Sequence, residues 1–240
     1  LLNDDLRNFS VNDGKFILTE EEGIPCLQKI IQPRIFCREK LPLLYGLMVE
    51  YIRVLQRAGI PLPEVRSHAH EENTLRFTCH YEGPNLQQLM QNREATLLTT
   101  DFAPLLSQII TIFQLAQAQS LSLDPHPKNF VVNEQRQVHY VDFSPPLLPQ
   151  YSALLLASLN PGHREAIKQN LACFEPQNLG YHFAADLIKG DARFYAILPQ
   201  LHQLFSARRI IHGSLEEFQQ RAEEIKSIEL ARAALDAPFL

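Results

Sequence analysis

The sequence predicts an α+β protein in which a small β-rich lobe is followed by a larger helical lobe. Short apolar runs bounded by turn residues recur in the first third of the chain, around one long stretch of helical periodicity. Beyond about residue 100 the apolar residues recur almost only at helical spacing. The break after the last predicted strand of the first part predicts an N-terminal lobe over residues 1–83 and a helical lobe over residues 84–240.

The first lobe opens with a predicted antiparallel hairpin. Residues 15–19 follow an Asn-Asp-Gly turn signal, and residues 24–31 follow the polar turn 20–23. Apolar residues at helical spacing from 44 to 55 then predict a helix that stops at Gly59. Residues 75–81 read as a further strand, which the following Gly-Pro breaks, so we expect the seam between the lobes near residues 82–85.

The second lobe begins with a helix that is apolar almost all round, over residues 102–118, and that pattern indicates burial. Short apolar runs at 130–132 and 138–141 predict a small hairpin around a polar turn. The remaining helical patterns lie at 151–159, 163–173, 183–189, 192–206 and 214–235.

Composition excludes several classes of protein. The 240 residues are 45% hydrophobic and 20% charged, which is typical of a globular chain long enough to bury a core without disulfide or metal support. A net charge of −5 disfavours non-specific binding to nucleic acid. We expect no membrane partner, because there is no apolar stretch of about 18 residues and no basic-then-apolar leader. The four cysteines (Cys26, Cys37, Cys79, Cys173) lack CxxC spacing, which predicts reduced thiols in a cytoplasmic protein.

The residues that indicate chemistry lie between 124 and 144. Asp124 and Asn129 share one loop, and the predicted hairpin after Asn129 closes so that Asp142 returns beside it. Two carboxylates and an amide oxygen would then converge, and these are the hard oxygen donors that Mg²⁺ prefers. The spacing therefore predicts a magnesium site.

This segment, which reads D-P-H-P-K-N from Asp124 and D-F-S from Asp142, resembles the protein-kinase-like fold. It is most similar to the aminoglycoside and choline phosphotransferase branch, although Ser122-Leu123 replaces the usual His-Gly pair and Ser144 the usual glycine. The resemblance implies an ATP- and Mg²⁺-dependent kinase of a small-molecule hydroxyl. Asp124 would accept the hydroxyl proton, while Asn129 and Asp142 would hold Mg²⁺ on the nucleotide.

The same resemblance implies a nucleotide site in the first lobe. Lys29, on the second strand, would contact the phosphates, with Lys15 and Lys40 as alternatives. Glu50, the sole acidic residue between 41 and 62, would pair with Lys29 and position it. Backbone groups near Tyr81 and Glu82 would meet the adenine edge at a hinge.

Other interpretations stay open beside this one. The turn at 20–23 is acidic and poor in glycine, whereas a phosphate-covering loop is usually rich in glycine. That difference favours a pseudokinase-like nucleotide-binding or scaffold module without transfer activity, and a helical interaction protein is a third possibility.

His68 and His70 could form a surface metal site with His80 or lie on a polar strand edge. His182 and Asp186 could line an acceptor pocket or form an ordinary i, i+4 pair. The acceptor and the oligomeric state are not indicated.

Overall fold

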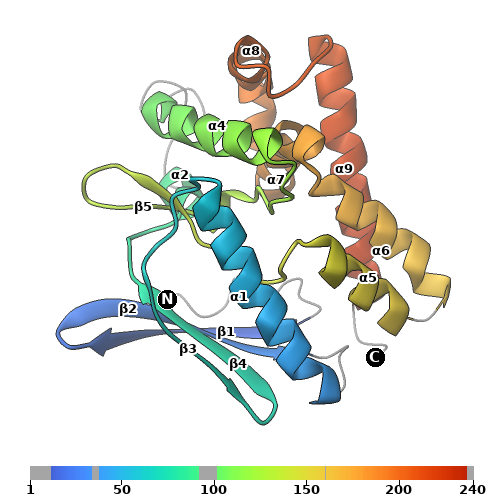
Figure 1. Ribbon diagram of the computed structural model, residues 1–240. Coiled ribbons are helices and arrows are strands. Elements are labelled where there is room, and N and C mark those ends of the chain that lie inside the picture. Colours follow the sequence, from blue (N-terminus) through green and yellow to red (C-terminus); the bar gives the residue numbers. More distant parts are fainter. Residues whose placement is uncertain (1–11, 34–37, 92–101, 160, 237–240) are drawn as a thin grey trace.

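The protein folds as two lobes (Figure 1). The computed structural model describes residues 12–33, 38–91, 102–159 and 161–236. An antiparallel sheet and one long helix make up the first lobe, and helices with a small hairpin make up the second. The predicted α+β architecture, with a small β-rich lobe before a larger helical one, is confirmed.

The sheet contains four strands in the order β1-β2-β4-β3, with antiparallel neighbours throughout. Its strands are β1 (Asn12–Glu21), β2 (Ile24–Pro33), β3 (Val65–Glu71) and β4 (Thr74–His80). Positive φ angles at Glu22 (55°) and Gly23 (79°) make the tight turn between β1 and β2. β3 forms an edge, and most of its side chains are exposed, which agrees with the polar-edge interpretation of His68 and His70.

Helix α1 (Leu41–Arg57) packs the first lobe together and contacts both β3 and α5 (Pro149–Ser158). Its buried stripe includes Leu44, Met48, Tyr51 and Leu55. These side chains recur at i, i+4, i+7 and i+11, which is one face of an α-helix. The helix ends just before Gly59, whose φ of +76° reverses the chain as the sequence predicts.

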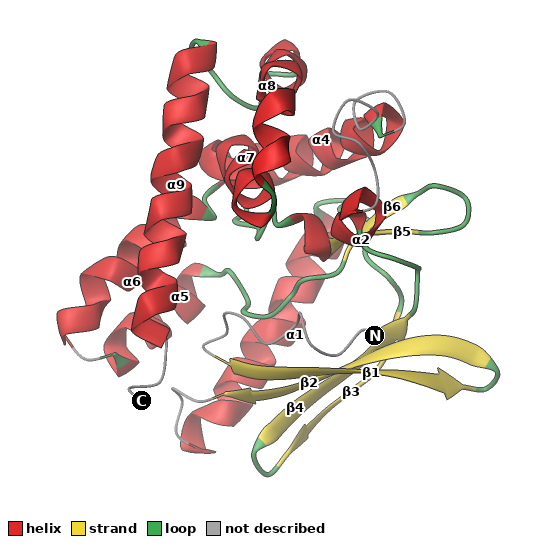
Figure 2. Ribbon diagram, turned by 180° about the vertical axis from the view of Figure 1, so that it is seen from behind, coloured by secondary structure: helices red, strands yellow, loops and turns green. Residues whose placement is uncertain are grey.

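The second lobe is built from helices around the hairpin of β5 (Phe130–Val132) and β6 (Val138–Tyr140) (Figure 2). The pattern at 192–206 divides into a 3₁₀ segment, Ala192–Ile197, and α8, because Pro199 favours a fresh helix start. The described α-helices are α2 (Leu86–Gln91), α4 (Ala103–Ala118), α5 (Pro149–Ser158), α6 (Pro161–Cys173), α7 (Leu179–Gly190), α8 (Leu198–Ala207) and α9 (Leu215–Asp236).

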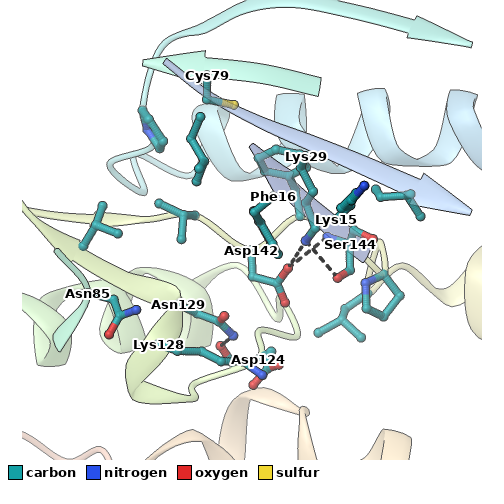
Figure 3. Close-up of a pocket in the computed structure, with 18 of the residues that line it drawn as sticks. Lys15, Phe16, Lys29, Cys79, Asn85, Asp124, Lys128, Asn129, Asp142 and Ser144 are labelled. Carbon is teal, nitrogen blue, oxygen red and sulfur yellow. Dashed lines mark hydrogen bonds and ion pairs between the residues drawn. The ribbon is translucent and has the colours of Figure 1, made fainter. Parts of the chain in front are cut away.

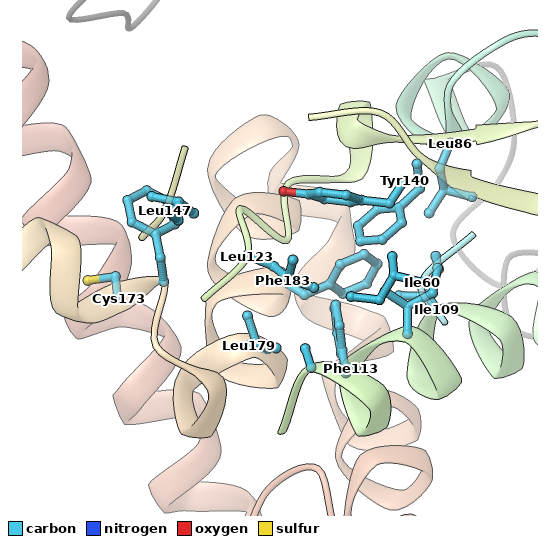
Figure 4. Close-up of a cluster of buried hydrophobic side chains, with 14 of the residues drawn as sticks. Ile60, Leu86, Ile109, Phe113, Leu123, Tyr140, Leu147, Cys173, Leu179 and Phe183 are labelled. Carbon is cyan, nitrogen blue, oxygen red and sulfur yellow. The ribbon is translucent and has the colours of Figure 1, made fainter. Parts of the chain in front are cut away.

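Aromatic rings fill the centre of the second lobe (Figure 4). Phe113 of α4 packs edge to face against Phe130 of β5 and Phe183 of α7, with ring centroids 6.0 Å apart in both pairs. The N–H of Tyr140 donates to the carbonyl of Pro61 at 2.8 Å, which joins the segment after α1 to the hairpin. The hairpin is therefore held by ring packing within the second lobe and by a hydrogen bond to the segment after α1.

Three of the four cysteines, Cys26, Cys79 and Cys173, are buried free thiols, and Cys37 lies outside the described residues. Burial raises the pKa of Cys79 and of Cys173 to about 12, so both stay protonated and unreactive near neutral pH. No helix in the described ranges is both long and apolar enough to cross a membrane.

Candidate active site

A cavity of about 710 Å³ lies between the two lobes. Strands β1 and β2 cover it, and the hinge at 81–85, the loop at 124–129 and the segment after β6 line its other side (Figure 3). Lys29, Tyr81, Glu82, Asp124, Asn129 and Asp142 all line this cavity, so six of the seven predicted site residues meet there.

The loop around Asp124 is ordered by its own side chains. The N–H of Asp124 donates to the Tyr140 hydroxyl at 3.0 Å, and Asp124 Oδ1 accepts the N–H of His126 at 3.1 Å. The N–H of Lys128 donates to His126 Nδ1 at 3.1 Å, so His126 also orders this loop. Asn129 Nδ2 donates to the Asp124 carbonyl at 3.1 Å, and that bond turns Asn129 Oδ1 away from this carbonyl.

The hairpin returns Asp142 to this loop, as its spacing predicts. The N–H of Val141 donates to the carbonyl of Asn129 at 2.9 Å, which closes the return. Asp142 Oδ1 is 2.8 Å from Lys29 Nζ, and the two side chains are only 11% and 12% exposed. Lys29 Nζ also lies 5.4 Å from the centre of the Phe16 ring, so an apolar roof shields the ion pair from water.

Glu50 does not pair with Lys29, and this prediction is wrong. Its carboxylate is 3.8 Å from Arg53 and 3.6 Å from Arg57 on the same helix, and the side chain is 44% exposed. Glu50 is one residue away from the buried position of Tyr51, so the helical rotation of about 100° per residue turns it to the solvent side. The apolar stripe of α1 and the arginines at i+3 and i+7 were signals for this placement.

Tyr51 is a site-supporting residue that sequence reasoning missed. Its hydroxyl donates to the carbonyl of Ser122 at 2.7 Å, so α1 fastens the start of the Asp124 loop. Burial raises the pKa of Tyr51 well above its usual range, with the charge of Asp142 as the next contribution. The phenol therefore remains a hydrogen-bond donor at any working pH.

The hinge residues line the cavity where the sequence places them. The N–H of Tyr81 donates to the carbonyl of Pro25 at 2.9 Å, so this group continues the sheet and does not face an adenine edge. The Glu82 carboxylate is 3.1 Å from His80 Nδ1 and 3.8 Å from His139 Nδ1. Adenine contact through the other backbone groups here stays a prediction.

The acidic turn between β1 and β2 lies beside the hinge. Cys26, near this turn, pairs with His80 at the end of β4, and Lys29 is about 16 Å from Ile24 along the strand. Arg66 is 3.7 Å from Glu21 and 3.1 Å from Glu22, so it offsets part of the negative charge of the turn. The turn thus does not cover the Lys29–Asp142 pair.

A buried network of charged groups connects α7 and α9 behind Asp124. His182 Nε2 is 2.7 Å from Glu229 Oε1 and 3.5 Å from Asp186 Oδ2, and Lys189 Nζ bonds to both carboxylates. Burial by itself would lower the pKa of His182, but the charges of Asp186 and Glu229 outweigh burial and raise it to about 9. The predicted i, i+4 pair of His182 and Asp186 is present, within a larger network.

The donor atoms of Asp124, His182 and Asp186 lie within 4.8 Å of one another, which is close enough to suggest a metal site. Two cations already neutralise this network, namely Lys189, 2.5 Å from Asp186, and a protonated His182 with no lone pair for a metal. Asn129 and Asp142 offer an amide oxygen and a carboxylate beside the cavity. That oxygen pair suits Mg²⁺ bound partly by nucleotide phosphates.

Comparisons with known proteins add little to this geometry. No protein-family model matches the chain, and no curated protein matches it in sequence. Among solved structures, a double mutant of the PknI kinase domain of Mycobacterium tuberculosis is similar with a TM-score of 0.45. The two are 18% identical, over 88% of this chain and 90% of that chain. The two-lobe fold and the site therefore stand on this chain's own structure, and the resemblance to the aminoglycoside and choline phosphotransferase branch stays a prediction.

Proposed function

We propose that the protein is an ATP- and Mg²⁺-dependent phosphotransferase that acts on the hydroxyl of a small molecule. The observation that carries this proposal is the contact of Lys29 with Asp142, 113 residues apart in sequence, in the cavity that Asp124 and Asn129 also line. A cation, two carboxylates and an amide oxygen around one large cleft are the groups that phosphoryl transfer needs.

Each of these residues has a role that its contacts support. The His126 N–H orients the Asp124 carboxylate, which would accept the proton of the attacking hydroxyl. Lys29 would neutralise phosphate charge, and Asn129 and Asp142 would hold Mg²⁺. The bound ion would supply further neutralisation of the phosphates.

A small-molecule acceptor is favoured by the chain after the hairpin. Only residues 143–148 separate Asp142 from the start of α5 at Pro149, and this segment contains Pro145 and Pro146. Such a short, stiff connection provides no extended platform for a peptide substrate.

The test combines a thermal shift with an assay for ADP release. Mg²⁺ with ATP should raise the unfolding temperature of the wild type. Asp124→Asn should keep that shift and lose turnover by about 10²-fold or more. Glu134→Gln, an equal charge change at the exposed turn of the hairpin, should keep both. A wild type that nucleotide does not stabilise, or an Asp124→Asn variant with native turnover, contradicts the proposal.

A second candidate is a module that binds nucleotide without transferring phosphate. Its support is the position of Glu50, which pairs with arginines of its own helix and leaves Lys29 to Asp142. Stabilisation by Mg²⁺ and ATP, with ADP release no higher in the wild type than in Asp124→Asn, would establish this candidate.

A further inference from the structure

The cavity extends past the Lys29–Asp142 pair to a far end at helices α5 and α6, which pack against each other (Figure 1). Five side chains give this far end an apolar wall. They are Leu147 before α5, Leu155 of α5, Ile167 and Leu171 of α6, and Phe174 just after α6. Leu171 is half-buried and the other four are buried, so these side chains border the cavity but are largely shielded from bulk solvent.

Few polar groups interrupt this apolar wall. Arg232 of α9 and Asn170 of α6 line the cavity there, and they bond to each other, from Nη1 to Oδ1 at 2.9 Å. No aspartate or glutamate within the described ranges of α5, α6 or α9 lines the cavity. An ammonium group bound at the far end would lack a carboxylate partner, and most hydroxyl groups of a sugar would face carbon. Because unpaired polar groups are costly to bury, the far end disfavours both kinds of ligand.

The far end is space that the side chains around it leave unfilled. Interiors are normally close-packed, and residues that border an empty apolar space lose contacts that would stabilise the fold. Asp124 lines the same cavity of about 710 Å³. Sites for small molecules combine an apolar wall with a few polar groups in this way. The arrangement fits a ligand with a hydrocarbon body and a hydroxyl group.

We propose that the far end binds the hydrocarbon body of an uncharged alcohol whose hydroxyl lies at Asp124. The inference rests on the proposed function and specifies its acceptor. In that reaction the alcohol oxygen bonds to the γ-phosphorus of ATP, the bond from that phosphorus to ADP breaks, and the hydroxyl proton passes to Asp124. The apolar wall would hold the alcohol in place through burial of its methylene groups.

A homologous series of alcohols tests this inference by binding alone. The probes are ethanol, 1-butanol and 1-hexanol, titrated by ligand-detected NMR in the presence of Mg²⁺ and ADP. Each CH₂ added should tighten binding about threefold, because it transfers apolar surface from water to the wall. Affinities that do not rise with chain length would overturn the inference.

Sorbitol is the matched polar probe, since it has the same number of carbons as hexanol and a hydroxyl on each. Both compounds are uncharged, so the comparison is independent of any charge at the far end. Hexanol should bind at least about tenfold more tightly than sorbitol, whose additional hydroxyls would face carbon. Equal affinities, or tighter binding of sorbitol, would overturn the inference.

A pair of leucine variants locates the binding at the far end. Leu171→Asn places an amide of similar size in the apolar wall, so it should weaken hexanol about fivefold or more and flatten the dependence on chain length. Leu156→Asn is the control, because Leu156 of α5 is also half-buried but does not line the cavity. It should leave the dependence unchanged.

A folded Leu171→Asn variant that binds the alcohols as the wild type does would overturn the inference. If that variant does not fold, the wild-type series and the comparison with sorbitol decide the matter.

The two proposals fail in different ways. If affinity rises with chain length but no ADP is released with any alcohol, the apolar site stands and the phosphotransferase proposal falls. If ADP is released with sorbitol and not with hexanol, the phosphotransferase stands and the apolar acceptor site falls.

Discussion

Lys29 is the residue on which the proposed nucleotide-binding end of the cleft depends. It contacts Asp142 Oδ1 at 2.8 Å and the carbonyl of Ser144 at 3.4 Å, beneath the ring of Phe16. An ion pair this shielded is costly to break on one side, because the remaining charge loses its partner. The lysine was predicted from its strand, but its partner was not, since the pair links segments far apart in sequence.

Replacing Lys29 with Met should therefore reduce both stability and nucleotide binding. We expect the free energy of unfolding to fall by about 2–3 kcal/mol, because Asp142 is left mostly buried without its cation. Urea unfolding measures the loss, and the thermal shift with Mg²⁺ and ATP should disappear. A Lys29→Met variant that nucleotide still stabilises as it does the wild type would contradict the role of Lys29.

The Glu50→Gln variant serves as the contrast to Lys29→Met. The Glu50 carboxylate is half-exposed and pairs only with arginines of its own helix, so its loss should change stability by less than about 0.5 kcal/mol. The KM for ATP should stay within about twofold of the wild type. A large rise in that KM would mean that Glu50 turns toward Lys29 when nucleotide binds.

At the scale of elements, the position of the hinge is set by the close approach of its backbone to the hairpin of β5 and β6. Gly83 has a φ of +125°, and a Cβ built there would lie 2.4 Å from the carbonyl oxygen of Val132 in β5. The N–H of Val132 also donates to the carbonyl of Pro84 at 3.0 Å. This contact fixes the distance between the sheet and the loop that carries Asp124.

Gly83→Ala should accordingly destabilise the protein by more than about 1 kcal/mol, since the backbone must move to admit the methyl group. Gly46→Ala is the matched control, because Gly46 is exposed in α1 and a Cβ there meets nothing within 4 Å. That control should be neutral or stabilising by roughly 0.5–1 kcal/mol. Chemical unfolding of both variants checks the contrast, and equal effects would refute it.

The elements that could be predicted are those in which the spacing of the apolar residues matches the face that is buried. The stripe of α1 and the all-round apolar α4 were evident because each buries the face that its periodicity indicates. The edge strand β3 was only partly evident, since its side chains are mostly exposed and show little alternation. The same periodicity places Glu50 on the exposed side of α1, where it pairs with arginines of its own helix and not with Lys29.

At the scale of the whole molecule, the network of His182, Asp186, Lys189 and Glu229 joins α7 to α9. It lies behind Asp124, and His126 Nε2 of the loop is 3.8 Å from Asp186. Burial raises the pKa of Asp186 to about 6, with the charge of Glu229 adding to the effect. Such a network makes the stability of the helical lobe depend on pH.

The direction of that dependence follows from His182. Its pKa is about 9 in the folded protein and about 6.5 in the unfolded chain, so the folded state binds more protons between these values. The free energy of unfolding should therefore be highest near and below pH 6.5. It should fall by up to about 3 kcal/mol as the pH rises from 6.5 to 9. Urea unfolding across this range measures the decline, which His182→Gln should flatten. A wild-type stability that does not fall above pH 6.5 would contradict the prediction.

The sequence by itself determined the order of the parts: a hairpin, a long helix, a hinge, a loop bearing Asp124 and Asn129, and a hairpin leading to Asp142. These depend on local turn chemistry and periodicity, which neighbouring residues specify. Only the tertiary structure decided that Lys29 pairs with Asp142, that the acidic turn lies beside the hinge, and that Asn170 and Arg232 meet at the far end of the cavity. Each of those contacts joins segments whose distance in space depends on strand register and helix packing, which no local pattern encodes.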